Sequence, residues 1–440
     1  MEEEVSPLLD RKLIVTHPHY IAQGGDRMDD ENFDWLLPIP CPECGATHAL
    51  AGMLWGLPSA PAEGNVVFGG CVDPNFDVLH VCVECGWSGE VDRSGRALTP
   101  TRAERVLGCL LGGAIGDALG APVEFWSSSR IHAEFPEGVR DYIPTGYGND
   151  PGLITDDTQM TLFTLEALLR VWQDDRIPRL IELHRSYLDW WHTQNVPEPP
   201  PDAPASSLAS QTWLYSRRAP GNTCASALIA ALGSGRLGQP ATNDSKGCGG
   251  VMRSAPFGLL PMFDGPDLAC AAAALTHGHP SGQVSSGALA ELISQLMSGR
   301  SLKDAVLHAI GWSQGRPGGE ETTHALTAAL DAALTEVPPT FDVVERLGGG
   351  WVGEEALAIG IYCALAYPDQ DQVLDALSLA VSHGGDSDST GEICGQILGT
   401  LHGVDALPTE LVARVEGRTV IEAMAAQTTE AILARSRVLG

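Results

Sequence analysis

Two short clusters of carboxylates and hydroxyls, far apart in the chain, have the residue types that a metal centre needs. Their six candidate ligands are Thr155, Asp156, Asp157, Asp386, Asp388 and Ser389. Oxygen donors of this kind are preferred by hard cations such as Mg²⁺, Mn²⁺ and Ca²⁺, whereas zinc favours nitrogen and sulfur. Asp and Thr are also ordinary helix N-caps, and a helix-like run follows each cluster. One carboxylate is enough for a cap, so the doubled carboxylates favour a metal site.

Two Cys-x-x-Cys-Gly sequences form the second chemical signal. They contain Cys41 and Cys44 in the first copy, and Cys82 and Cys85 in the second. Four thiolates complete the tetrahedral shell of a structural Zn²⁺ ion, and a redox dithiol is the alternative. The two pairs are further apart than in an ordinary zinc ribbon, so an inserted hairpin or loop is expected between them. The segment resembles bacterial zinc ribbons.

The elements that must position these residues change in character near residue 100. Upstream, Pro and Gly are frequent and helical periodicity is poor; downstream, segment after segment repeats with the period of an α-helix. The sequence therefore predicts a zinc-ribbon-like domain over 1–100 and an all-α domain over 101–440. The run 106–123 is nearly all apolar, but Asp117 in its middle argues against a membrane span. Its glycines, spaced by four, predict a buried helix that a second helix approaches closely.

Composition excludes several classes of partner. The chain of 440 residues has a net charge of −30, which disfavours non-specific binding to nucleic acid or to an anionic membrane. The N-terminus has no basic segment of the kind that begins a signal peptide. Most of the 11 cysteines are scattered singly in apolar runs, as in proteins of a reducing compartment. We therefore expect a cytoplasmic protein without a membrane partner.

Five motifs occur in an order that resembles one known family. They are Gly-Cys-Leu-Leu-Gly-Gly-Ala-Ile-Gly-Asp and its continuation at 108–124, Thr-Asp-Asp-Thr at 155–158, Gly-Cys-Gly-Gly-Val-Met-Arg-Ser-Ala-Pro at 247–256, Thr-His at 276–277 and Gly-Gly-Asp-Ser-Asp-Ser-Thr at 384–390. Over about residues 103–435, this chain resembles the ADP-ribosylglycohydrolases. The resemblance implies an orthogonal all-α bundle with two Mg²⁺ or Mn²⁺ ions, which removes ADP-ribose from a modified target.

The resemblance assigns roles to individual residues of this chain. Its metal ligands fall on the two acidic clusters, and its closing glutamate falls on Glu124 as the catalytic group. The positions that bind ADP-ribose fall on Ser245, Gly247, Cys248, Gly249, Gly250, Met252 and His277. The chain departs from some animal members, with Lys246 where an aromatic ring can cover the ligand and Cys248 where Asn can occur.

The residues are chemically suited to this activity. Two cations can orient the sugar and acidify a water, while Glu124 can exchange a proton with the water or the leaving group. The bare backbone N–H groups of Gly247, Gly249 and Gly250 can face a diphosphate. Alone, Glu124 could be a solvated residue past a helix end, and His277 a structural histidine.

Several alternatives remain open at the level of sequence. The second reading of the function is a catalytically inactive module that binds ADP-ribose. The bond cleaved can be to arginine nitrogen, serine oxygen, a nucleic-acid group or a free metabolite. Residues 1–100 contain more acids than bases, so the zinc ribbon is expected to meet a protein partner; nucleic acid is expected only as a modified substrate.

Overall fold

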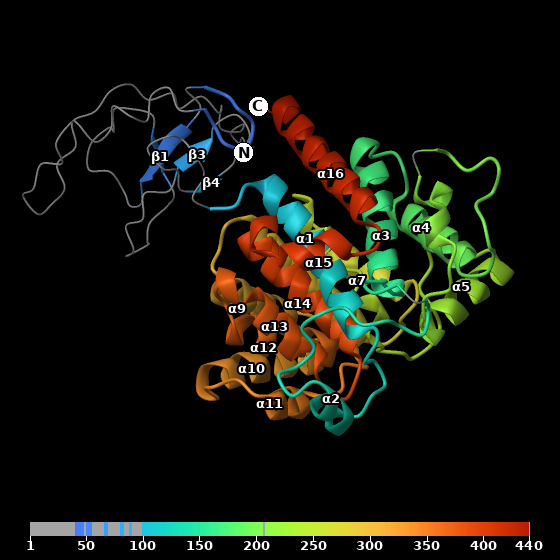
Figure 1. Cartoon of the computed structure of the whole chain (residues 1–440). Coiled ribbons are helices and arrows are strands. Elements are labelled where there is room, and N and C mark those ends of the chain that lie inside the picture. Colours follow the sequence, from blue (N-terminus) through green and yellow to red (C-terminus); the bar gives the residue numbers. More distant parts are fainter. Residues whose placement is uncertain are drawn as a thin grey trace, which may run out of the picture. The chain divides into compact units, whose positions relative to one another are not determined.

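The computed structural model describes residues 40–47, 50–54, 66–68, 80–82, 88–89, 99–148, 150–205 and 207–439. The chain divides into two compact units (Figure 1). One contains Met1–Thr99 with Ser436–Gly440, and the other contains Pro100–Arg435. Within the described residues, no helix is both long enough and apolar enough to cross a membrane.

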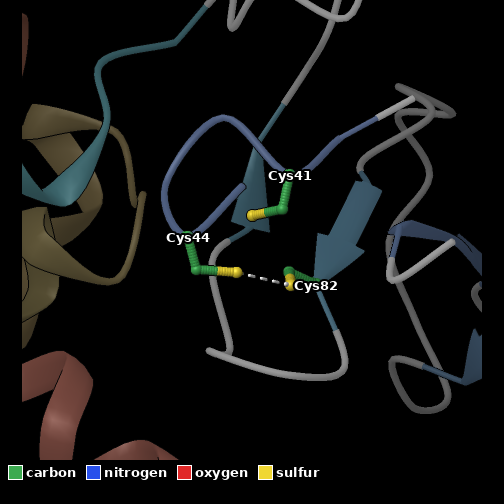
Figure 2. Close-up of side chains that lie close together, drawn as sticks. All are labelled: Cys41, Cys44 and Cys82. Carbon is green, nitrogen blue, oxygen red and sulfur yellow. Dashed lines mark hydrogen bonds between the residues drawn. The ribbon is translucent and has the colours of Figure 1, made fainter. Parts of the chain in front are cut away.

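The described part of the N-terminal unit is a small sheet beside a cysteine-bearing turn. Its strands are β1 (Leu50–Leu54), β2 (Val66–Phe68), β3 (His80–Cys82) and β4 (Ser88–Gly89), in the order β2-β1-β3-β4. Strand β1 is parallel to β2 and antiparallel to β3. Before β1, the N–H of Gly45 donates to the carbonyl of Cys41 over 2.8 Å. Gly45 has a φ of +72°, a left-handed conformation that glycine adopts without steric cost. The turn places Cys41 and Cys44 opposite Cys82 at the end of β3 (Figure 2).

In the described residues of the second unit, α-helices and short 3₁₀ helices make up the regular secondary structure apart from isolated bridges, and irregular loops connect them. Its helices are α1 (Arg102–Gly120), α2 (Ser128–Glu134), α3 (Asp156–Gln173), α4 (Arg179–Thr193), α5 (Asn222–Ser234), α6 (Pro256–Leu259), α7 (Gly265–Ala274), α8 (Pro280–Met297), α9 (Leu302–Gln314), α10 (Glu320–Thr335), α11 (Phe341–Leu347), α12 (Gly353–Ala366), α13 (Val373–Val381), α14 (Ser387–His402), α15 (Thr409–Arg414) and α16 (Arg418–Leu439). The all-α prediction for this part of the chain is confirmed.

The glycine-rich run predicted to be a buried helix is α1, and its close partner is α14. A side chain on Gly112 would overlap the carbonyl oxygen of Gly395, and one on Gly395 would overlap that of Gly112. Gly108 and Gly399 meet in the same way one turn along. Because both helices lack side chains along this seam, their backbones touch and leave little freedom in their relative position. This seam fixes the end of α1 against the start of α14.

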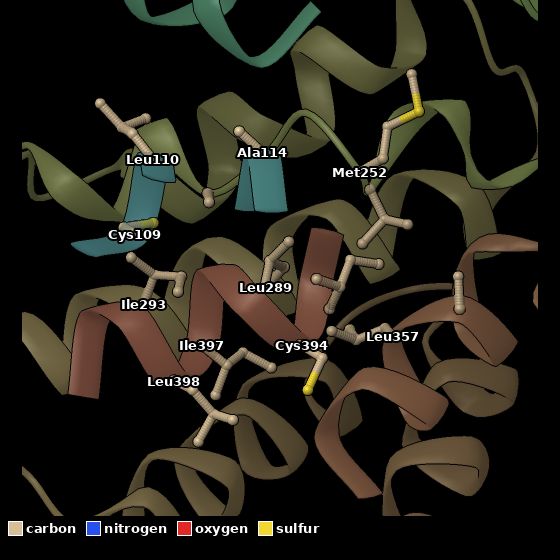
Figure 3. Packing of buried hydrophobic residues seen from close by; sticks show 14 of the residues in the cluster. Cys109, Leu110, Ala114, Met252, Leu289, Ile293, Leu357, Cys394, Ile397 and Leu398 are labelled. Atoms are coloured by element: carbon tan, nitrogen blue, oxygen red, sulfur yellow. The ribbon is translucent and has the colours of Figure 1, made fainter. Parts of the chain in front are cut away.

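The other faces of this helix pair pack into the main apolar core (Figure 3). Leu110 and Ala114 of α1 are buried, as are Cys394 and Ile397 of α14. Leu289 of α8 and residues of α12 complete this layer (Figure 3). Around this centre, α4 and α5 lie on one side and α9 and α10 on the other (Figure 1). The end of α1 and the start of α14 are therefore held by a closely packed interior.

Candidate metal centre

The first acidic cluster forms the N-terminus of α3. Thr155 is the N-cap, and its hydroxyl accepts a hydrogen bond from the N–H of Asp157 over 3.2 Å. The cluster is held from behind by Asp117 of α1, whose carboxylate accepts from the N–H of Thr155 over 3.0 Å and from the hydroxyl of Thr158 over 2.6 Å. The side chain of Asp156 accepts from the N–H of Gly221 over 3.2 Å. These hydrogen bonds hold the first residues of α3 in place.

The second acidic cluster forms the N-terminus of α14 and meets the first directly. The hydroxyl of Ser389 donates to Oδ2 of Asp157 over 2.6 Å, although these residues are 232 positions apart. The N–H of Asp386 donates to the carbonyl of Gly349 over 2.8 Å, which fixes the residue that begins the helix. The carboxylate of Asp388 accepts from the N–H of Ser389 over 3.0 Å. The two clusters predicted to bind metal therefore meet through Ser389 and Asp157.

Glu124 reaches this cluster from the turn that follows α1. Its N–H donates to the carbonyl of Gly120 over 3.0 Å, and Gly120 itself packs against the backbone of Ser387. One carboxylate oxygen from each of Glu124, Asp386 and Asp388 lies within 4.8 Å of the others. The side chain of Glu124 is half-buried beside these two aspartates.

Burial, and after it the charges of neighbouring carboxylates, opposes ionisation of the acids in this centre. Burial, followed by the charges of Asp386 and Asp156, raises the pKa of Glu124 to about 8. Burial, followed by the charge of Asp117, raises the pKa of Asp156 to about 8, even though the N–H of Gly221 works in the opposite direction. The pKa values of Asp157 and Asp388 are also well above their usual range, with burial as the main cause.

This donor set fits hard divalent cations. Within the described part of the chain, no Lys or Arg forms an ion pair with Glu124 or with the four clustered aspartates. Several buried carboxylates without a counter-charge are costly, and an oxygen-lined group of this kind suits a hard divalent cation.

The Gly-rich loop, residues 245–253, lies against the second cluster. The thiol of Cys248 donates to Oδ2 of Asp386 over 2.8 Å. The loop is pinned by its backbone, since the N–H of Cys248 donates to the carbonyl of Trp351 over 3.2 Å and the N–H of Gly353 donates to that of Lys246 over 2.8 Å. The hydroxyl of Ser389 also lies 4.0 Å from the sulfur of Met252. Ser245, Gly247, Gly249 and Gly250 form the remainder of this loop.

The ring of His277 packs against the Gly-rich loop. A side chain on Gly249 would lie 3.2 Å from Cε1 of His277, so the two are in contact. Nδ1 of His277 is hydrogen-bonded to the hydroxyl of Thr276 over 2.9 Å. Burial, with a smaller effect of Arg253, lowers the pKa of His277 to about 3, so the ring is neutral at physiological pH.

Lys246, at the start of the Gly-rich loop, is bound to carboxylates. Its amine forms ion pairs with Glu321 over 2.8 Å and with the buried Glu354. Glu321 also accepts from the hydroxyl of Ser281 over 2.5 Å. In this arrangement, Lys246 ties the loop to α10 and α12.

Sequence reasoning did not assign a site role to two further acids, Asp117 and Glu392. Glu392 lies one turn beyond Asp388 and is 1% exposed, and its Oε1 accepts from the hydroxyl of Thr161 over 2.7 Å. Burial, followed by the charge of Asp117, raises the pKa of Glu392 well above its usual range. Both acids could have been noticed from the sequence, because each interrupts an apolar helical run with an ionisable residue.

In the N-terminal unit, three of the four predicted zinc ligands lie together. The sulfurs of Cys41, Cys44 and Cys82 are within 4.8 Å of one another, and those of Cys44 and Cys82 are 3.7 Å apart (Figure 2). The fourth predicted ligand, Cys85, lies outside the described residues. The complete zinc site therefore stays a prediction.

Comparison with known sequences decides the family. The model of the family described as ADP-ribosylglycohydrolase matches residues 98–437, which include both acidic clusters and the Gly-rich loop. The chain belongs to the ADP-ribosylglycohydrolase family. The resemblance inferred from the motifs is confirmed.

Individual members of the family are distant relatives. An ADP-ribosyl-[dinitrogen reductase] glycohydrolase of Rhodospirillum rubrum is 25% identical over 323 residues, covering 72% of this chain and 92% of that protein. The uncharacterized protein YegU of Escherichia coli K12 is 28% identical over 341 residues, covering 72% of this chain and 92% of its own. A solved structure, an ADP-ribosylglycohydrolase-related protein complex, is 25% identical with a TM-score of 0.56, and the match covers 75% of this chain and 99% of that one.

Proposed function

We propose that this protein is a metal-dependent hydrolase that cleaves the glycosidic bond between ADP-ribose and a modified target. Two contacts carry this proposal: Glu124, which is half-buried, lies beside Asp386 and Asp388 at the start of α14, and Ser389 of α14 bonds Asp157 at the start of α3. Membership of the family and the name of the Rhodospirillum rubrum relative support ADP-ribosylated molecules as the substrate class.

The proposed metal centre holds two Mg²⁺ or Mn²⁺ ions. Its ligands would be Thr155, Asp156, Asp157, Asp386, Asp388 and Ser389. When bound, the cations neutralise these carboxylates, orient the ribose through its hydroxyls and increase the acidity of a water. The family provides the precedent for the cations, and the all-oxygen donor set of this chain fits them.

Glu124 is proposed to transfer the proton. Water oxygen forms a bond to the anomeric carbon of the ribose, the bond to the leaving atom of the target breaks, and one water proton moves to Glu124. The carboxyl then delivers that proton to the leaving group. Its position beside Asp386 and Asp388 and its raised pKa suit a group that must both accept and release a proton near neutral pH.

The Gly-rich loop is proposed to bind the diphosphate and distal ribose. Gly247, Gly249 and Gly250 expose backbone N–H groups, which are suitable donors to phosphate oxygens. Ser245, Cys248 and Met252 lie on the same segment, and His277 supports it. Holding ADP-ribose here would place its terminal ribose over the adjoining acidic clusters.

The decisive experiment measures release of ADP-ribose from arginine-, serine- and nucleic-acid-linked substrates by mass spectrometry. With Mg²⁺ or Mn²⁺ we expect release from at least one substrate, and EDTA should abolish it. Asp386→Ala is the matched inactive variant. If the wild-type protein binds ADP-ribose but releases it from none of these substrates, the protein is a binding module.

For the N-terminal unit we propose one structural Zn²⁺ ion held by Cys41, Cys44, Cys82 and Cys85. The sulfur cluster of the first three supports this assignment. We further propose that this unit recruits a protein partner, since residues 1–100 contain more acids than bases.

A further inference from the structure

Two exposed aromatic rings lie at the edge of the candidate metal centre. Phe125 is 73% exposed and Trp351 is 42% exposed, and their rings stack with centroids 5.2 Å apart and planes inclined by 21°. A lone exposed apolar residue needs no explanation, whereas two in contact beside a candidate site point to a ligand or a partner. The two rings come from segments far apart in the chain, so the packing of the helical unit brings them together.

The backbone of Phe125 is held in a conformation that bulky residues rarely adopt. Its φ is +66°, in the left-handed region that favours glycine. The N–H of Glu124 donates to the carbonyl of Gly120 over 3.0 Å, and the N–H of Trp126 donates to the carbonyl of Val123 over 2.9 Å. These bonds fix the turn on both sides of Phe125. Backbone strain of this kind is costly and is found most often at functional sites.

Trp351 follows a segment that contacts both the Gly-rich loop and the second acidic cluster. Its carbonyl accepts from the N–H of Cys248 over 3.2 Å. A side chain on the preceding Gly350 would lie 3.3 Å from Cβ of Asp386, so the two residues pack together. The stacked pair therefore lies at the rim of the metal centre, with Phe125 on the side of the proposed catalytic glutamate.

The position of Phe125 in the chain indicates which part of a substrate it can contact. A group that donates a proton to the leaving atom must come within hydrogen-bond distance of that atom, so the target lies beside Glu124. The ADP-ribose part is assigned to the Gly-rich loop and the acidic clusters. The residue directly after Glu124, with its ring in solvent, is therefore positioned to contact the target and not the adenosine.

The chemistry of this edge favours a planar cation. Guanidinium groups stack on the faces of aromatic rings, to which the positive charge is attracted. Carboxylates flank the pair on both segments. Glu124 precedes Phe125, and Glu355 accepts from the N–H of Gly349 over 3.0 Å in the segment that leads to Trp351.

The same turn already contains one such contact within the chain. Cζ of Arg130 lies 3.2 Å from the ring centroid of Trp126, the residue after Phe125. A nucleobase is also planar, but the net charge of −30 disfavours a nucleic-acid target. A guanidinium on a protein side chain is therefore the better fit.

We propose that Phe125, supported by Trp351, is a specificity-determining residue that stacks on a guanidinium group of the target. The ring recognises the planar cation joined to ADP-ribose, and the stack holds the bond to be cleaved beside Glu124. This inference rests on the proposed function, because it assigns a further part of the same site.

The test compares four ligands by calorimetric titration of the full-length protein carrying Glu124→Gln, with Mg²⁺ present. The ligands are ADP-ribose, an arginine-linked ADP-ribosyl peptide, a serine-linked ADP-ribosyl peptide and an ADP-ribosylated oligonucleotide. Further replacement by Phe125→Leu or Trp351→Leu should weaken binding of the arginine-linked peptide about three- to tenfold. Binding of ADP-ribose and of the serine-linked peptide should stay unchanged. Phe125→Tyr keeps the ring and should bind like the parent protein, as should Phe263→Leu, which removes a fully exposed ring between α6 and α7.

Four results would each overturn the proposal. Equal weakening of ADP-ribose would assign the rings to the adenosine end, and equal weakening of the serine-linked peptide would indicate a general apolar contact. Greater weakening of the oligonucleotide would assign a nucleobase, and an unchanged constant for the arginine-linked peptide would leave the rings without a role in binding. If none of the four ligands binds the parent protein, the proposed function itself fails. Binding of ADP-ribose without an effect of Phe125→Leu on the arginine-linked peptide rejects the stacking alone.

Discussion

Glu124 lies where the turn after α1 meets the start of α14, and its surroundings define what its carboxyl can do. Burial and the charges of Asp386 and Asp156 raise its pKa to about 8, so without cations the carboxyl is mostly protonated at pH 7. A bound divalent cation would favour the ionised form because an opposite charge lowers a carboxyl pKa. Glu124 can therefore act as a base in the loaded centre and remain close to the range in which it returns a proton.

Replacement of Glu124 by Gln separates proton transfer from binding. The amide keeps the size of the side chain but removes its basicity. We expect kcat to fall by about 10²–10⁴-fold, while the dissociation constant of ADP-ribose changes by no more than a few fold. Single-turnover hydrolysis and calorimetric titration of ADP-ribose at fixed Mg²⁺ measure the two quantities. Normal turnover in Glu124→Gln would remove this residue from the mechanism.

At the scale of elements, the seam between α1 and α14 sets the geometry of the centre. Gly116 and Gly391 meet backbone to backbone near the end of α1, just as Gly112 and Gly395 do one turn earlier. Glu124 follows α1, and Asp386 and Asp388 begin α14, so the spacing of these helices fixes the spacing of the carboxylates. The glycines of this seam thus serve the site as well as the fold.

Gly112→Ala should destabilise the helical unit, because its new methyl group would overlap the carbonyl of Gly395. We expect a loss of about 1–3 kcal/mol in the free energy of unfolding, as in other overpacked cores. Gly311→Ala on α9 is the matched control: a side chain there meets nothing within 4 Å, and alanine is the better helix former by about 1 kcal/mol. Denaturant unfolding compares the two. Equal stabilities of the two variants would contradict the role of the seam.

At the scale of the whole molecule, the crowded carboxylates couple stability to pH and to metal. In the folded protein Glu124 and Asp156 have pKa values of about 8, compared with ordinary values of 4.5 and 3.8. Between those values the folded state holds more protons than the unfolded state, so stability falls as pH rises. In the metal-free protein, these two groups should therefore contribute fully to the free energy of unfolding below about pH 4. That contribution should be lost as the pH rises to about 8.

Thermal unfolding in EDTA at pH 5, 6, 7 and 8 tests this coupling. Relative to wild type, Asp156→Asn should gain stability as pH rises, because the amide cannot ionise. Adding Mn²⁺ should raise the Tm of wild type more at pH 8 than at pH 6, since the cation replaces the protons. A variant whose Tm follows the wild type at every pH would show that Asp156 is not part of the crowded group.

The N-terminal unit should contain one zinc ion per chain. Four thiolates bind zinc far more tightly than oxygen ligands bind magnesium, so the zinc should survive dialysis against a mild chelator. Cys41→Ser should lose it and make residues 40–100 sensitive to proteolysis, while the unfolding transition of the helical unit stays unchanged. Cys270→Ser, a cysteine of α7, is the control for zinc content. Freshly purified, reduced protein without zinc would reject the site.

Local patterns gave the fold class and most candidate residues of this protein. The period of the apolar residues predicts helices, the doubled acids predict helix starts that bind metal, and the order of five motifs indicates the family. The glycine spacing of 108–120 also predicted a close helix partner. These properties are readable because they depend on residue type and on spacing along one segment.

Contacts between distant segments required the tertiary structure. The sequence does not indicate that Ser389 donates a hydrogen bond to Asp157, or that Lys246 forms an ion pair with Glu354. Nor does it indicate that Asp117 of α1 accepts hydrogen bonds from the start of α3. The identity of α14 as the partner of α1 belongs to the same class. Such contacts depend on how all the helices pack together, because burial and close approach are properties of the whole assembly of side chains and not of any one stretch of sequence.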